Sequence, residues 1–221
     1  MSWESTLVYY RLINQETALR LGGLHSARLV MSSVDFHEIE ELQRRGDWEE
    51  AGRVLAREAR RLENAGADAI VLCTNTMHRV ADAVSSAVAI PLLHILDATA
   101  AAIREADLDV VGLLGTRFTM EQDFYRQRLE DSGLRVLVPE PAERTEVHRV
   151  IYEELCRGIV LPESRQEYLR LIERLRARGA QGVILGCTEI SLLIAPEDCP
   201  LPAFDTTALH ASAAVDFALA D

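Results

Sequence analysis

The chain has 221 residues, 48% of them hydrophobic, so it can bury a substantial core as one α/β domain or two lobes. Its formal net charge of -12 argues against nucleic-acid binding, because phosphate contacts need a basic surface. The sequence shows no apolar run approaching the roughly 20 residues that cross a bilayer, and residues 1–11 lack a signal-peptide pattern. We therefore expect a cytoplasmic protein without a membrane partner.

Lysine is absent, since all 23 basic residues are arginine. A lysine-free chain cannot form an internal Schiff base with pyridoxal phosphate and has no Walker A lysine, so two large enzyme classes are excluded. The cysteines contain no CxxC pair, and the histidines do not have metal-ligand spacing. We expect no metal and no cofactor.

Apolar, β-branched runs alternate with amphipathic segments along the chain, a pattern typical of α/β proteins with a mainly parallel sheet. Two helices have clear end signals. One should begin after Asp47 and stop at Gly66, and another should open at Ser164 or a neighbour and stop at Gly179. The predicted strands are Arg28 to Met31, Ala69 to Leu72, Pro91 to Ile95, Val110 to Leu114, Leu134 to Val138, Val183 to Leu185 and Pro202 to Phe204.

An internal repeat relates the two halves of the chain. Residues 66–76 align with residues 179–189, each with a helix before and an apolar strand within, and residues 90–99 echo residues 201–207. The repeat predicts two pseudosymmetric lobes, each a mainly parallel sheet flanked by helices, with the active site in the cleft between them. In this alignment Thr74 lies opposite Cys187.

Each repeated segment ends a strand with small polar residues and then enters a predicted helix. Backbone N–H groups at such a helix start can bind a carboxylate, and the helix dipole should lower the pKa of a thiol there towards neutrality. Cys187 is therefore a candidate base or nucleophile, with core packing as the alternative. Paired lobes with one reactive group each suit the inversion of a carbon centre.

Several segments together resemble the aspartate/glutamate racemase family, and most closely its L-aspartate/glutamate-specific branch. The resemblance covers essentially the whole chain and implies a two-lobed α/β fold, cofactor-free racemisation by two bases, an acidic amino acid as substrate, and a homodimer. The segments that carry it are residues 1–6, 35–40, 73–78, 113–120 and 186–190.

The resemblance implies a catalytic pair, Thr74 and Cys187. Thr74 stands where the wider family has cysteine. Because a threonine hydroxyl is a poor base and a thiolate a good one, we expect a slow reaction or one-sided α-proton exchange. The lobes are expected at residues 1–97 with 206–221 and at residues 98–205. The implied substrate-binding residues are Met1, Gln43, Asn75, Thr76, Thr116, Thr188 and Glu189, with Glu189 also supporting the Cys187 turn.

Two departures from the family pattern affect the site. The lysine that binds the distal carboxylate in some members has no counterpart here, which leaves four arginines as weaker candidates. Members of the family also carry a short apolar strand and a Gly-Gly turn before the segment that begins at Met1, so we expect additional residues upstream. The four arginines are Arg44, Arg45, Arg117 and Arg157.

Other polar residues near the motifs have simpler interpretations. Cys73 should point to the opposite side of the strand from Thr74 and pack in the core. His78 should be structural, and Asp97 and Asp205 should be helix N-caps rather than acids.

Two alternative functions remain open. A single effective cysteine could serve a decarboxylase or a maleate-isomerase-like enzyme on the same scaffold. The protein could also bind acidic amino acids without turnover, which would raise its melting temperature without exchange of the α-proton.

Overall fold

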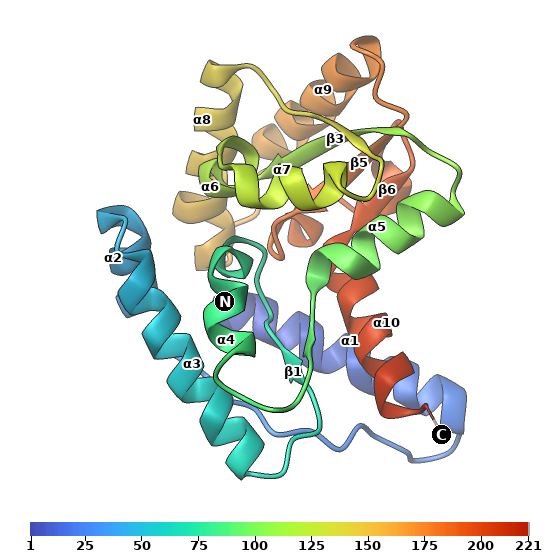
Figure 1. The fold of residues 1–221 in the computed structure, drawn as a ribbon. Coiled ribbons are helices and arrows are strands. Elements are labelled where there is room, and N and C mark those ends of the chain that lie inside the picture. The colour runs from blue at the N-terminus through green and yellow to red at the C-terminus, as the bar shows by residue number, and fades with distance from the viewer. Residues whose placement is uncertain (221) are drawn as a thin grey trace. The chain divides into compact units, whose positions relative to one another are not determined.

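The structure is a computed structural model that describes residues 1–220 (Figure 1). The α helices are α1 Trp3–Leu21, α2 Phe36–Arg45, α3 Trp48–Asn64, α4 Ala81–Ser85, α5 Ile95–Glu105, α6 Arg117–Glu121, α7 Asp123–Glu130, α8 Pro141–Arg149, α9 Pro162–Ala177 and α10 Thr206–Ala218. The strands are β1 Ile70–Val71, β2 Leu92–Leu93, β3 Val110–Gly115, β4 Arg135–Leu137, β5 Gly182–Gly186 and β6 Ala203–Asp205. Short 3₁₀ helices include Thr76–Val80, Leu155–Arg157 and Ile190–Leu192, and Val150–Glu154 forms a π-helical turn.

The chain divides into two compact units. Unit 1 comprises residues 1–94 and the chain from residue 210 onward, and unit 2 comprises residues 95–209. The boundaries between the units fall after residues 94 and 209, whereas the sequence predicts lobe boundaries after residues 97 and 205. Within residues 1–220, every helix is too short or too polar to cross a membrane.

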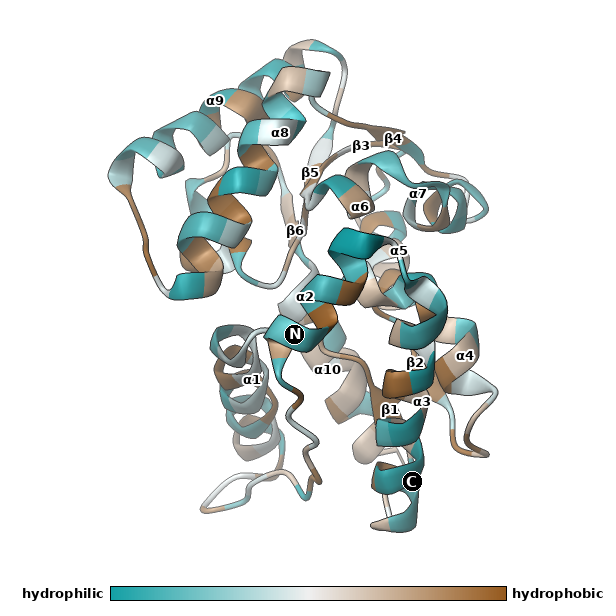
Figure 2. Cartoon of the chain, turned by 90° about the vertical axis from the view of Figure 1, so that its left-hand side faces the viewer, coloured by the Kyte–Doolittle hydropathy of each residue, from teal (hydrophilic) through white to brown (hydrophobic). Residues whose placement is uncertain are grey.

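Unit 2 is built on a parallel sheet with the strand order β4-β3-β5-β6. Helices α8 and α9 cover one face of this sheet, and α5 and α7 cover the other (Figures 1 and 2). Strands β3 and β5 lie in the middle and are almost entirely buried, which explains why both read as continuous apolar runs. The prediction of a mixed α/β fold with parallel sheets flanked by helices is confirmed.

Six of the seven predicted strands overlap strands of the structure, but the one at Arg28 to Met31 is wrong. Residues 24–35 form neither helix nor strand, and Leu29, Val30 and Met31 are exposed. Their apolar side chains gave a strand-like pattern, but a strand requires a neighbour that satisfies its backbone hydrogen bonds.

Unit 1 packs helices around a short parallel pair, β1 with β2, in which Ile70 lies opposite Leu92. Asp47 caps the start of helix α3, because its carboxylate accepts a hydrogen bond from the Glu50 N–H at 3.1 Å. The ribbon of α3 carries both hydrophilic and hydrophobic residues in Figure 2, as in an amphipathic helix. Gly66 follows the helix with a φ of 88°, a backbone conformation that favours glycine. The predicted start and stop signals of this helix are confirmed.

Of the other predicted helix starts, the one at Ser164 or a neighbour lies two residues before Ser164, and the cap at Asp97 is wrong. Helix α9 begins at Pro162, which suits a first helical position, and the Ser164 hydroxyl instead donates to Glu154 at 2.6 Å. Asp97 lies inside the first turn of α5, where it pairs with Arg128 at 2.8 Å. Asp205 does cap α10, since its carboxylate accepts from the Thr207 N–H at 2.8 Å.

His210 on α10 is fully buried in unit 1 between two polar partners. Its Nε2 faces the Leu93 carbonyl at 2.8 Å, and its Nδ1 lies 2.9 Å from the Tyr9 hydroxyl. A carbonyl can only accept, so Nε2 carries the proton and Nδ1 accepts from Tyr9. Burial lowers the pKa of His210 from 6.5 to about 4, which keeps the ring neutral.

This depressed pKa predicts acid sensitivity. The unfolded chain binds a proton at His210 below about pH 6.5 while the folded protein resists it, so stability should fall as pH drops from 6.5 to 4. The loss attributable to His210 should reach up to about 3 kcal/mol at the acid end. Denaturant unfolding gives the free energy of unfolding of the wild type and of His210→Gln at each pH in this range. Plotted against pH, the two free energies should converge towards acid, whereas parallel plots would contradict the assignment.

Candidate functional site

Strand β5 places Cys187 at its carboxyl end. All five residues of the strand are buried, and Gly186 directly precedes the cysteine. A Cβ on Gly186 would lie 2.6 Å from Leu113 Cδ1 and 3.0 Å from the Leu114 carbonyl oxygen, so a side chain there would require Leu113 to move and would crowd the backbone of β3. The Ile190 N–H then donates to the Cys187 carbonyl at 3.0 Å and closes the turn.

The side chains of this turn share one carboxylate. Cys187 Sγ lies 2.9 Å from Glu189 Oε2, and Thr188 Oγ1 lies 2.8 Å from the same oxygen. All three residues are buried. Since one oxygen receives both contacts, the thiol and the hydroxyl are the donors and the carboxylate is the acceptor.

The pKa of Cys187 is raised well above its ordinary value. Burial is the main cause, and the negative charge of Glu189 adds to it. The prediction that a helix dipole lowers this pKa towards neutrality is therefore wrong. The helix that follows, Ile190–Leu192, is a three-residue 3₁₀ turn, too short to stabilise a thiolate against burial. In the free protein Cys187 is a neutral thiol.

Three further residues surround this thiol, and the sequence analysis did not identify them as part of the site. Burial raises the pKa of Cys156, and Glu189 raises it further through its charge and a hydrogen bond. Tyr125 and Tyr168 are fully buried and their pKa values are raised mainly by burial; a thiolate at Cys187 raises both pKa values further. No local motif marks these positions, so only the packing around β5 reveals them.

Thr116 belongs to the same end of the sheet. It follows Gly115 of β3, which pairs in register with Gly186 of β5, so Thr116 and Cys187 directly follow a matched pair of residues. Its hydroxyl oxygen accepts from the Thr119 N–H at 3.2 Å and thereby caps α6. Unit 2 thus gathers Thr116, Thr188 and Glu189 around the end of strands β3 and β5.

In unit 1, Thr74 follows β1 in a buried turn with Asn75 and Thr76. The Thr74 N–H donates to the Leu72 carbonyl at 2.7 Å, and its own carbonyl lies 2.7 Å from His78 Nδ1. The expected structural role of His78 is consistent with this contact. As after β5, a 3₁₀ helix rather than an α helix follows the turn, here Thr76–Val80.

Met1 and Gln43 contact the flanks of this turn. The Met1 amino group donates to the Cys73 carbonyl at 2.8 Å, and Gln43 Nε2 lies 3.0 Å from Met77 Sδ. Unit 1 therefore brings together its five sequence-predicted site residues, which are Met1, Gln43, Thr74, Asn75 and Thr76.

The arginines considered for the distal carboxylate have exposed side chains. Arg44 pairs with Glu41 at 3.7 Å, and Arg117 pairs with Glu121 at 3.4 Å. Arg45 and Arg157 are also exposed. Among residues 1–220, no group of three or more histidine, cysteine or acidic side chains is arranged to hold a metal ion.

Known proteins with similar sequence and structure point to one family. The Asp/Glu/Hydantoin racemase family profile matches residues 1–214. The crystal structure of a putative Asp/Glu racemase from Yersinia pestis is 56% identical in sequence and has a TM-score of 0.91. This match covers 100% of the present chain and 96% of the Yersinia pestis chain. An aspartate racemase homologue from Pyrococcus horikoshii is 35% identical in sequence and has a TM-score of 0.82. This match covers 97% of the present chain and 94% of the Pyrococcus horikoshii chain.

A curated protein agrees with these structures. The broad specificity amino-acid racemase RacX of Bacillus subtilis is 25% identical over 177 residues, which are 79% of this chain and 75% of that protein. Racemases are isomerases, and the match to the family profile extends through both units. The chain belongs to the Asp/Glu/Hydantoin racemase family.

Proposed function

We propose that the protein is a cofactor-independent racemase that inverts the α-carbon of aspartate or glutamate, with Cys187 and Thr74 as the two proton-transferring groups. The observation that carries the proposal is the buried Cys187 thiol held against the Glu189 carboxylate at 2.9 Å. The acidic substrate is supported by the family and by the relatives from Yersinia pestis and Pyrococcus horikoshii.

Glu189 gives Cys187 a route to both of its required protonation states. As a neutral thiol, Cys187 can donate its proton to one face of the α-carbon. To act as a base, it first passes the S–H proton to Glu189 Oε2, so that the S–H bond breaks, an O–H bond forms and the total charge stays at −1. The thiolate then removes the α-proton and becomes a thiol again.

Thr74 supplies the opposite face in this scheme. Its hydroxyl donates a proton readily but is a poor base, so the two faces differ in reactivity. Because racemisation has an equilibrium constant of one, kcat/KM must still be equal in the two directions. The difference should appear as α-proton exchange by Cys187 that outpaces inversion, with the L enantiomer as the one exchanged.

Cytoplasmic localisation and a homodimer stay predictions. The lysine-free sequence supports a reaction that needs no Schiff base to pyridoxal phosphate.

Solvent deuterium exchange tests the function directly. Both enantiomers of aspartate and glutamate are incubated in deuterated water, and the α-proton signal and the enantiomer ratio are followed together. We expect wash-in that depends on the enzyme and exceeds inversion for the L enantiomer. Equal, inversion-coupled wash-in from both enantiomers would contradict the one-sided mechanism. Ligand-dependent stabilisation without any exchange would indicate a binding protein, and carbon dioxide release from malonates would indicate a decarboxylase.

Variants show which residue transfers the proton on each face of the substrate α-carbon in this assay. Cys187→Ser should lower both exchange and inversion by at least about 100-fold, the usual contribution of a positioned acid–base group. Thr74→Val should abolish inversion yet keep exchange of the L enantiomer by Cys187. Thr17→Val is the matched control, since Thr17 is also buried in unit 1 but bonds the Ile13 carbonyl within α1.

Glu189→Gln separates the charge of Glu189 from its shape. Because the carboxylate charge raises the pKa of Cys187, its removal should lower that pKa. It should also slow racemisation, because the thiol loses its proton acceptor. Thiolate absorbance is titrated in the wild type and in Glu189→Gln. From each titration, the titration of the same protein carrying Cys187→Ser is subtracted, which removes the signal of the other cysteines. A pKa that stays the same or rises in Glu189→Gln would rule out this role.

A further inference from the structure

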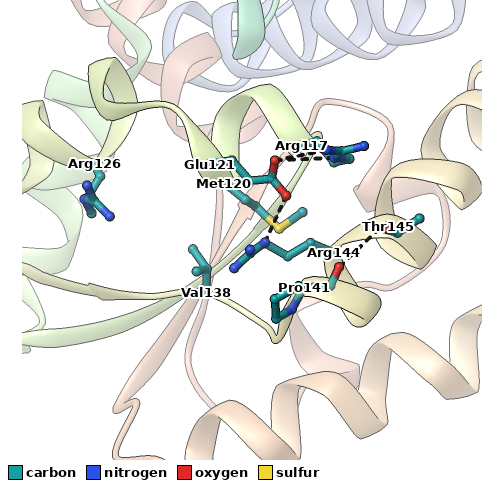
Figure 3. A pocket seen from close by; sticks show the side chains of 8 residues that line it. All are labelled: Arg117, Met120, Glu121, Arg126, Val138, Pro141, Arg144 and Thr145. Carbon is teal, nitrogen blue, oxygen red and sulfur yellow. Dashed lines mark hydrogen bonds and ion pairs between the residues drawn. The ribbon is translucent and has the colours of Figure 1, made fainter.

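A hollow of about 480 Å³ opens in unit 2 outside the Cys187 turn (Figure 3). It lies between α6, the start of α8 and the end of β4, and Arg126 of α7 stands at one side. Its charged lining consists of Arg117, Arg126, Arg144 and Glu121. The proposed proton transfers use none of these residues, and Arg117 is one of the four arginines that the sequence offers for the distal carboxylate of the substrate.

The lining of this hollow is richer in arginine than the protein as a whole. Acidic residues outnumber basic ones 35 to 23 in the chain, whereas the lining holds three arginines and one glutamate. Arg126 also pairs with Asp123 and Glu130 of α7, at 2.6 and 3.6 Å, but these acids do not line the hollow. The lining side chains alone carry a formal charge of +2, which the carboxylates of Asp123 and Glu130 beside Arg126 offset.

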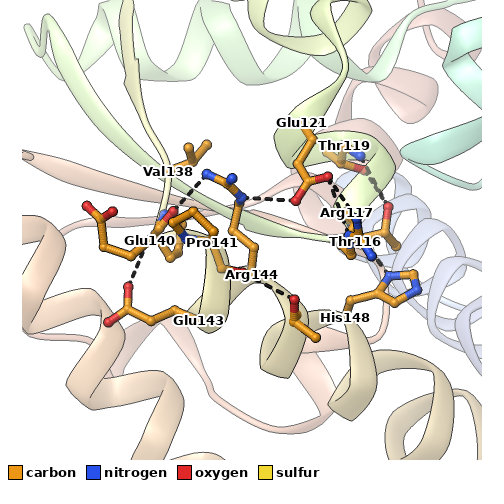
Figure 4. Close-up of polar contacts among 12 residues, drawn as sticks. Thr116, Arg117, Thr119, Glu121, Val138, Glu140, Pro141, Glu143, Arg144 and His148 are labelled. Atoms are coloured by element: carbon orange, nitrogen blue, oxygen red, sulfur yellow. Dashed lines mark hydrogen bonds and ion pairs between the residues drawn. The ribbon is translucent and has the colours of Figure 1, made fainter.

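Two of the arginines are held in place by Glu121. Arg144 Nε lies 3.0 Å from Glu121 Oε1, and Arg117 Nε lies 3.4 Å from Oε2 of the same carboxylate (Figure 4). Arg144 also donates through Nη1 to the Pro139 carbonyl at 3.1 Å. A guanidinium has five N–H groups, and these contacts use two of those on Arg144. Its side chain is 21% exposed, so it is partly buried before any ligand arrives.

The remaining lining is mainly apolar. Met120, Val138 and Pro141 form the wall beside Arg144 (Figure 3), and Thr145 adds a hydroxyl whose oxygen lies 3.2 Å from the Pro141 carbonyl. An apolar wall next to fixed guanidinium groups fits a ligand with both a charged end and a nonpolar body.

We propose that this hollow binds a small organic phosphate monoester with an apolar body. The oxygens of a phosphate group suit the planar donor geometry of the three arginines that line the hollow. The apolar part packs on Val138 and Pro141, in front of the largely buried Met120. The binding site is separate from the racemase proposal and stands or falls independently of it.

Calorimetric titration of the full chain with phenyl phosphate tests the proposal. We expect one site, with binding at least about tenfold tighter than for inorganic phosphate or benzoate, because each lacks one half of the ligand. The absence of saturable binding would overturn the proposal, and equal affinity for inorganic phosphate would overturn the role of the apolar wall.

Three variants locate the binding. Arg144→Gln should weaken it at least about tenfold, and Arg126→Gln, which leaves the Pro139 contact intact, should weaken it by a smaller factor. Arg176→Gln is the matched control in the same unit, since Arg176 is exposed on α9 and pairs with Glu173 at 3.4 Å. Affinity that is unchanged in both hollow variants would show that the anion binds elsewhere.

Discussion

The hydrogen bond between the Cys187 thiol and the Glu189 carboxylate is the interaction on which the candidate chemistry depends. It exists because β5 is buried along its whole length and ends in Gly186, where a side chain would strike β3. The turn therefore closes under the protein surface and holds the thiol and the carboxylate 2.9 Å apart. Buried polar groups of this kind require partners, and each satisfies the other.

Burial decides the protonation state of this thiol. A helix terminus stabilises a nearby charge by about 0.3–1 kcal/mol, whereas full burial shifts a pKa by up to about 3–5 units, or about 4–7 kcal/mol. The carboxylate of Glu189 acts in the same direction as burial. A resting thiol beside a carboxylate differs from the preformed thiolate that the sequence suggested, but it suits a group that must both give and take a proton.

Local sequence signals were sufficient where an element is determined by its own residues. The buried runs of β3 and β5 and the caps at Asp47 and Asp205 follow from apolar continuity and from side-chain geometry. They failed where a partner decides the outcome. Residues 28–31 have strand-like composition but no paired strand, and the proximity of Cys156 to Glu189 joins positions 33 residues apart in sequence. The repeat located Thr74, Cys187 and Glu189, yet the protonation of Cys187 depends mainly on its burial, which no motif encodes.

The protonation of Cys187 in the free protein is the most direct test of this account. Infrared difference spectroscopy of the wild type minus Cys187→Ser at neutral pH isolates the S–H stretching band of this residue. The account predicts a clear band that Glu189→Gln displaces, because the S–H group loses its charged acceptor. Absence of an S–H band from Cys187 at neutral pH would show a resting thiolate and contradict the central claim.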